Sequence, residues 1–190
     1  MKNVAFLTLG LVLVLGAGFV FVRPSARSSP EALSNLPEIE VKSTLEYSLN
    51  QALLHDPASR LLAVVLNFEG DSSGNELVNH YHLFSQAEKG FFTINPLHNF
   101  SIEDIDPSSL GLDLTLEPID ADLIQIWPSA ALAIANNNGG ANFSQEGDFK
   151  IDLLLTKPEE EVLAWYITYR HLEKGLFKIA VNALSGTVLK

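Results

Sequence analysis

Two histidines separated by one residue, His80 and His82, are the side chains best suited to metal chemistry in this sequence. Alternate residues of a strand point to one face, so the two imidazoles would lie together. With His55 or His98 they would supply enough nitrogen ligands for a divalent ion. The alternative is a pair of interior histidines, because a repeat described below aligns both with core-facing positions. We adopt this alternative and expect no bound metal and no cofactor.

Gln86 extends the polar character of the same segment. The repeat aligns it with a histidine of the second copy, His171. Together, His80, His82 and Gln86 make the inner face of the first hairpin more polar than that of the second. These three residues define an alternative function for the protein, a small-ligand or metal-binding sensor that uses this face.

The other reactive side chains do not form a pattern typical of an enzyme. Serine, histidine and aspartate occur, but no Gly-x-Ser-x-Gly sequence positions a nucleophile. Cysteine is absent, which excludes thiol catalysis, disulfides and cysteine-ligated metals. The acidic side chains between residues 103 and 122 lack the fixed spacing of a calcium loop, so they indicate a solvated surface. We therefore predict no catalytic residues and no enzymatic activity.

The charge of the chain limits its partners. The formal net charge is −11 at pH 7. Nucleic acids and anionic lipid surfaces both require a basic surface on the protein that binds them. The composition thus argues against nucleic-acid binding and against a second, peripheral attachment to a membrane.

An internal repeat indicates the elements that position these side chains. Residues 81–94 and 166–179 both begin with tyrosine and share Glu-Lys-Gly, phenylalanine and isoleucine in register. Each copy follows a segment with helical spacing, residues 39–55 and 119–138, and then a strand. Such self-similarity is typical of a duplicated unit. The predicted fold class is α+β, with two tandem units that each pack a helix on an antiparallel sheet.

The second hairpin allows a more detailed prediction. A three-residue loop, Glu173-Lys174-Gly175, would pair Tyr169 with Ile179 on the core face. It would also place Gly175 at the left-handed position that such a loop requires. Gly90, in the same position of the first copy, is expected to have a positive φ as well.

The outer face of that hairpin is a candidate partner-binding surface. Tyr166, Thr168 and Arg170 on one strand and Lys178 on the next would all point away from the core. Aromatic and arginine side chains are typical anchors of protein interfaces. The alternative is an ordinary solvated sheet face with long side chains lying along it.

The N-terminal segment predicts export. Residues 4–22 carry no charged side chain, and a helix of that length spans about 28 Å, close to the roughly 30 Å of a bilayer core. We expect a transmembrane helix here that precedes the two units. A secretory signal cleaved near residues 16–18 is the alternative. Residues 23–36 are rich in serine, proline and alanine and predict a linker.

The charges that flank this segment point the other way. Lys2 precedes it, whereas Arg23 and Arg27 follow it. By the positive-inside rule, that distribution favours a cytoplasmic location for the C-terminal part. We nevertheless favour export, because of a family resemblance in the second half of the chain.

The resemblance lies in four short sequences of residues 121–190. They are PSAALAIA at 128–135, a Gly-Gly pair, AWYITY at 164–169, and FKIAVNALSGTVL at 177–189. This pattern resembles the PepSY domain, with its alanine-rich helix and its last strand ending in Val-Asp-Ala-x-Thr-Gly-x-Val. Asn182 and Ser185 stand where that family usually has aspartate and threonine, and both retain a side chain able to cap a turn. Residues 37–118 look like a diverged copy.

The resemblance implies both a domain plan and a function. The plan comprises an anchor or signal at 1–22, a linker at 23–36, a diverged repeat at 37–118 and a PepSY-like domain at 119–190. PepSY domains are extracytoplasmic proteins of bacteria and archaea, with a proposed role in binding or inhibiting peptidases. We therefore expect a single-pass membrane protein with a periplasmic binding domain, or a secreted one after signal cleavage. Its expected partner is a protein or peptide of the cell envelope.

Overall fold

The computed structural model describes residues 38–71, 74–87, 90–105, 116–144, 148–159 and 161–189. Its strands form one eight-stranded antiparallel sheet in the order β4-β3-β2-β1-β5-β6-β7-β8. The strands are β1 Arg60–Asp71, β2 Gly74–Ser85, β3 Phe91–Asn95, β4 Ser101–Ile105, β5 Phe149–Thr156, β6 Ala164–His171, β7 Gly175–Asn182 and β8 Val188–Leu189.

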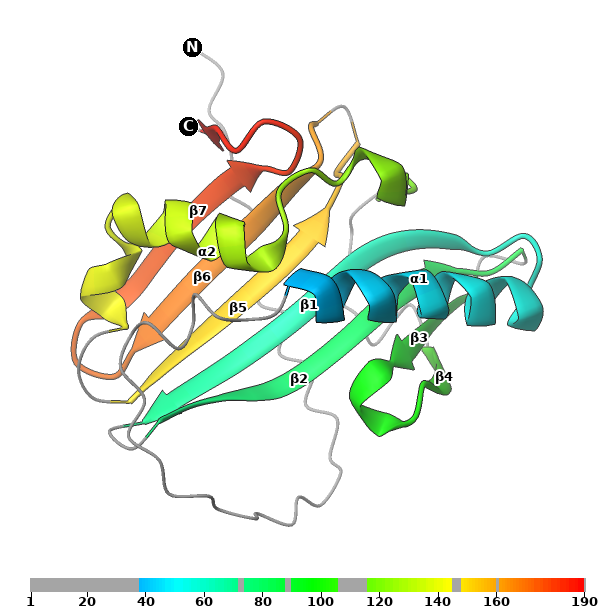
Figure 1. The fold of residues 1–190 in the computed structure, drawn as a ribbon, viewed down its shortest axis with the longest axis horizontal. Helices are drawn as coiled ribbons and strands as arrows, with labels where there is room; N and C mark the ends of the chain where they lie inside the picture. The colour runs from blue at the N-terminus through cyan, green and yellow to red at the C-terminus, as the bar shows by residue number, and fades with distance from the viewer. Residues whose placement is uncertain are drawn as a thin grey trace.

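Two α-helices lie on the same face of this sheet (Figure 1). They are α1, Glu38–His55, and α2, Pro128–Asn137, with shorter 3₁₀ turns η2 Pro96–His98, η4 Ala121–Leu123 and η5 Gly140–Phe143. The helix α1 lies over the strands of the first half and α2 over those of the second (Figure 1). Their apolar sides and the facing strands form one main core, with Trp165, Tyr169 and Phe84 among its largest fully buried side chains.

The predicted fold class is wrong, because the two halves do not form separate sheets. Strands β1 and β5, which begin the sheet in each half, pair with each other from Ala63↔Thr156 to Gly70↔Phe149. Alone, each half would leave the backbone N–H and C=O groups along one side of a long apolar strand without partners. Pairing β1 with β5 satisfies both strands at once. The described fold is therefore mostly one antiparallel sheet with only two α-helices.

The sequence of β1 contains a sign of this central position. Residues 61–66, Leu-Leu-Ala-Val-Val-Leu, are all buried, with at most 5% of any residue exposed. A strand covered on one face only would alternate apolar and polar residues, whereas a strand buried on both faces reads as a continuous apolar run. The run therefore indicates that β1 is buried on both faces. Leu62 and Ala63 belong to a second, smaller core cluster, separate from the main core under the helices.

The repeat in the sequence corresponds to two hairpins with the same register. In the first, His82 pairs with Ile94 and Phe84 with Phe92. In the second, Ile167 pairs with Ile179 and Tyr169 with Phe177. The pairs occupy equivalent positions of the repeat, so the duplicated sequence has kept its local strand pairing.

The predicted hairpin register is wrong by two residues. Tyr169 pairs with Phe177 rather than Ile179, and the loop consists of residues 172–174. A shift of two residues preserves the side-chain faces, and Tyr169 and Ile179 both contribute to the helix-covered core. Gly175 has the expected positive φ, 83°. Gly90 does not, so that prediction is wrong.

The expected helix at residues 119–138 is shorter than predicted. Proline lacks a backbone donor and fits best in the first turn of a helix, and α2 starts at Pro128 after the separate turn η4. At the other end, Gly139 has a φ of 114° and starts the next turn. Only the second half of the apolar pattern is therefore α-helical.

The N-terminal apolar segment, residues 4–22, and the linker at 23–36 lie outside the described residues. Within the described ranges, no helix is long and apolar enough to span a membrane. The transmembrane helix of the predicted fold class falls on residues outside these ranges.

Candidate functional site: the open sheet face and a buried histidine pair

The face of the sheet opposite the helices carries the predicted partner-binding residues. Tyr166, Thr168 and Arg170 lie on β6, and Lys178 lies on β7 directly opposite Thr168. Arg170 and Lys178 are exposed, and the other two are partly buried. No helix of the described ranges packs over these positions (Figure 1). The structure thus brings the four residues together on one accessible surface, which we call the open face.

Polar contacts between three strands hold Arg170 in place. Its Nη2 is 3.0 Å from Asp152 Oδ2 on β5, and Asn67 Nδ2 on β1 donates to Asp152 Oδ1 at 2.8 Å. Lys150 and Glu69 form a further ion pair on this face. Exposed pairs contribute only about 0–1 kcal/mol each. Their main effect here is to orient the guanidinium toward β5, where Asp152 is held in turn by Asn67 of the first half.

Tyr166 is fixed at the other end of β6. Its hydroxyl donates to Glu161 Oε2 at 2.9 Å. Burial, and then this hydrogen bond with the charge of Glu161, raises the pKa of Tyr166 above its ordinary value. The phenol therefore stays neutral, and its amphipathic ring lies on the same face of β6 as Arg170. The described part of this face thus combines an oriented arginine, a tyrosine and an exposed lysine. Arginine and tyrosine are typical anchors of protein interfaces.

The histidine pair lies on the opposite, helix-covered face. His80 and His82 are 3% and 0% exposed. Their Nε2 atoms are 2.9 Å apart, and the rings meet edge to face. One imidazole therefore donates to the other through a single shared proton. The prediction that both are interior histidines is confirmed.

Burial keeps this pair neutral. Desolvation lowers the pKa of His80 to about 4 and that of His82 well below its ordinary value, with the charge of His80 as a second cause for His82. His82 Nδ1 has no hydrogen-bond partner. Ser48 Oγ, on the buried side of α1, also lacks one. Sequence reasoning missed Ser48, although it lies between Leu45 and Ala52 at helical spacing.

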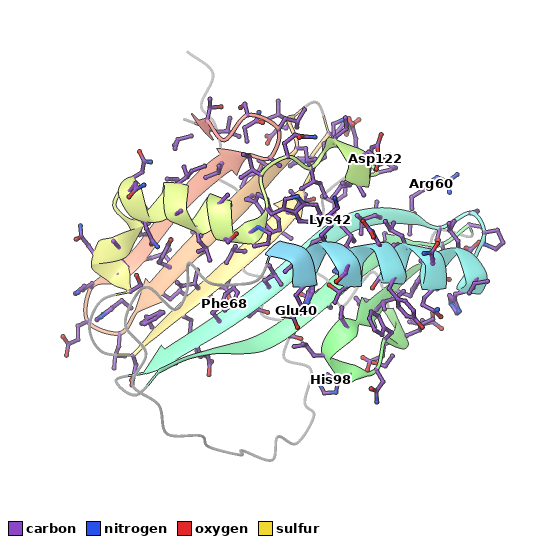
Figure 2. All side chains as sticks on the ribbon, in the orientation of Figure 1. Glu40, Lys42, Arg60, Phe68, His98 and Asp122 are labelled. Atoms are coloured by element: carbon purple, nitrogen blue, oxygen red, sulfur yellow. The ribbon has the colours of Figure 1, made fainter. Side chains whose placement is uncertain are left out.

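The third residue of the predicted ligand site is elsewhere. Gln86 follows the end of β2, about 13 Å along the strand direction from His82 at 3.3 Å per residue. Its Nε2 donates to Asp104 Oδ1 at 2.7 Å. Of the other candidate ligands, His98 lies beside β3 and β4 and projects outward (Figure 2). Among the described residues, no three histidine or acidic side chains form a metal-binding group.

The last of the segments that carry the family resemblance ends in a turn. Asn182 Oδ1 accepts hydrogen bonds from the backbone of Leu184 and Ser185 at 2.8 and 2.9 Å. Gly186 follows with a φ of 73° and donates to the Asn182 carbonyl. The asparagine thus caps this turn, as its side-chain shape predicts. These contacts hold the chain at the end of β7.

Comparison with known proteins identifies no relative: no family model, no curated protein and no solved structure matches this chain.

Proposed function

We propose that this protein is a non-enzymatic, extracytoplasmic binding module that holds a protein or peptide of the cell envelope on its open face. The observation that carries the proposal is the position of Tyr166, Thr168, Arg170 and Lys178 together on that face. The helices occupy the other face, so these side chains remain available to a partner (Figure 1).

The chemistry of the open face supports contact with another protein. Arg170 is already oriented by Asp152, so little side-chain entropy is lost when it binds. The neighbouring Tyr166 adds area at low entropic cost, because its ring has few rotatable bonds. Regulation of a peptidase or of an envelope process is the role that the PepSY resemblance suggests for such a module.

The location is part of the proposal. The uncharged residues 4–22 would direct export of the rest of the chain. A reporter fused after residue 190 should be active outside the cytoplasm. Activity confined to the cytoplasm would refute this location, and the mature N-terminus would distinguish a retained segment from a cleaved one.

Pull-down from solubilised envelope tests the function. The wild-type chain should retain a partner, and Arg170→Ala or Tyr166→Ala should weaken retention by about tenfold, as expected for interface anchors. Arg60→Ala is the matched control, since Arg60 is exposed at the start of β1, outside the Tyr166–Lys178 patch. Equal loss with Arg60→Ala, or unchanged retention with both open-face variants, would contradict the proposal.

A small-ligand sensor is the second candidate function. The observation that favours it is that three buried side-chain atoms of the described residues have no hydrogen-bond partner: His82 Nδ1, Ser48 Oγ and Ser59 Oγ. A small polar molecule in the core of the first half would satisfy such groups. Mass spectrometry of the native protein tests this candidate: a bound small molecule that His82→Ile removes would support it, and the bare mass would oppose it.

A further inference from the structure

The strand β4 ends the sheet on the side of the first half. It pairs with β3 along Phe91↔Ile105 to Asn95↔Ser101, and no described strand lies beyond it. Its three central residues, Ile102 to Asp104, are exposed. The outward backbone N–H and C=O groups of an edge strand are a template for another strand. At the opposite edge, β8 has only two residues, so β4 offers the longer template.

A strained turn holds this edge in position. Asn99 and Phe100 have φ values of 53° and 54°, a left-handed conformation that is costly for phenylalanine. The Phe100 ring contacts Tyr47 of α1, with centroids 4.2 Å apart, and packs against the main core. Such strain persists only where surrounding contacts impose it. The edge is therefore fixed before any partner arrives.

The two sides of β4 differ in chemistry. Ile102 lies opposite buried Ile94, on the helix-covered side, and remains 37% exposed. Glu103 lies opposite Thr93, on the open side. Asp104 lies opposite buried Phe92, on the same side as Ile102, and also has an exposed carboxylate. A second copy of the chain pairing here would bring like charges together, which is unfavourable. A strand with basic side chains would instead gain attraction from the same carboxylates.

We propose that β4 binds an extended basic peptide as a ninth strand of the sheet. The peptide places an apolar side chain beside Ile102 and a lysine or arginine beside Glu103, in alternation. Backbone hydrogen bonds supply affinity and the alternating side chains supply selectivity. This site is separate from the open face around Arg170. An experiment can therefore refute binding at one of the two sites without refuting binding at the other.

Fluorescence anisotropy with the full chain tests the proposal. The probe is a labelled peptide of about eight residues that alternates valine and lysine. Two matched peptides serve as controls: one with N-methyl groups along one backbone edge, and one with glutamate in place of lysine. The first keeps the charge but loses the donors of one edge, so it should bind about tenfold more weakly. The second should not bind.

Two variants of the protein complete the experiment. Glu103→Lys should weaken binding of the lysine peptide by about tenfold, and Glu103→Gln by less. Glu173→Lys makes the same charge change in the exposed loop between β6 and β7, and this variant should bind the peptide as the wild type does. Equal binding of the N-methylated peptide would show attraction by charge alone and overturn the proposal. Unchanged affinity of the Glu103→Lys variant would also overturn the proposal. A wild-type dimer that dissociates in the Glu103→Lys variant would overturn it as well.

Discussion

The buried histidine pair should make the stability of this fold depend on pH. In the unfolded chain, His80 and His82 bind protons near pH 6.5. In the folded chain, burial holds the pKa of His80 at about 4 and that of His82 well below its ordinary value. Between these limits the unfolded state binds more protons. The part of the folding stability that depends on neutral histidines is therefore fully present above about pH 6.5. It is lost as the pH falls toward 4.

The size of the effect follows from the shift. For His80 alone, 6.5 − 4 = 2.5 units, at about 1.4 kcal/mol per unit, corresponds to about 3.5 kcal/mol. His82 adds a contribution of the same sign. With two protons involved, the slope approaches about 2.7 kcal/mol per pH unit below pH 6. Since a typical domain has only about 5–15 kcal/mol of stability, we expect a large loss by about pH 5.

Urea unfolding of the full chain, followed by tryptophan fluorescence at several pH values between about 7.5 and 5, measures this loss. The informative variant is His80→Leu combined with His82→Ile, because removal of both partners leaves no buried polar atom of the pair. The free energy of unfolding of this double variant should fall less steeply with acid, because its unfolding takes up as many as two fewer protons. His82→Ile alone leaves His80 Nε2 without a partner and should cost about 1–3 kcal/mol at neutral pH.

An exposed histidine provides the control. His98→Gln removes one imidazole from the surface turn η2 and should leave the wild-type profile in place. The reasoning would be refuted if the wild type and the double variant lost stability in parallel between pH 7.5 and 5. It would also be refuted if His98→Gln flattened the profile as much as the double variant does.

Three further predictions concern turns, and urea unfolding measures each. Gly175→Val should lower the free energy of unfolding by at least about 1–2 kcal/mol. The cause is the φ of 83° alone, because nothing lies within 4 Å of the added Cβ. Lys174→Ala should lower it by less than about 0.5 kcal/mol, and equal losses would contradict the backbone argument. Gly140→Ala should destabilise more than Gly175→Ala, since its Cβ would lie 2.6 Å from the Tyr169 ring; the reverse order would show that the ring moves aside freely. Asn182→Ala should cost about 1–2 kcal/mol and Asn182→Asp much less, because aspartate keeps the acceptor for two backbone donors; similar costs would rule out capping.

Local patterns in the sequence determine the hairpins and their faces. The repeat predicts both hairpins, and alternation places Tyr169, Ile167 and His82 inside and Arg170 outside, as observed. The glycine after Glu173-Lys174 has the predicted positive φ. Side-chain faces alternate every two residues, so they depend on local register and survive the two-residue error in pairing.

The register itself depends on more than the turn. Leu172 donates its backbone N–H to the Asp148 carbonyl, and His171 Nδ1 accepts from the backbone of Glu173 and Lys174. These contacts hold the loop at residues 172–174. Gly90 of the first copy lacks the positive φ of Gly175, so the shared Glu-Lys-Gly sequence does not impose the same backbone conformation on its glycine.

In the candidate sites too, the sequence predicts the residues of a single hairpin but not their contacts with distant strands. The open-face residues lie on one hairpin, so the sequence alone groups Tyr166, Thr168, Arg170 and Lys178 correctly. Asp152, which orients Arg170, comes from another strand, and Asn67 comes from the other half of the chain. Contacts of this kind leave no periodic pattern in the sequence.

The largest error, two sheets instead of one, has the same origin. Hairpin pairing joins residues close along the chain, where the loop itself limits the choices. Pairing between β1 and β5 joins residues on either side of a long intervening segment. Which strands meet there depends on which arrangement buries both apolar runs and satisfies their backbone groups, and only the complete tertiary structure decides it.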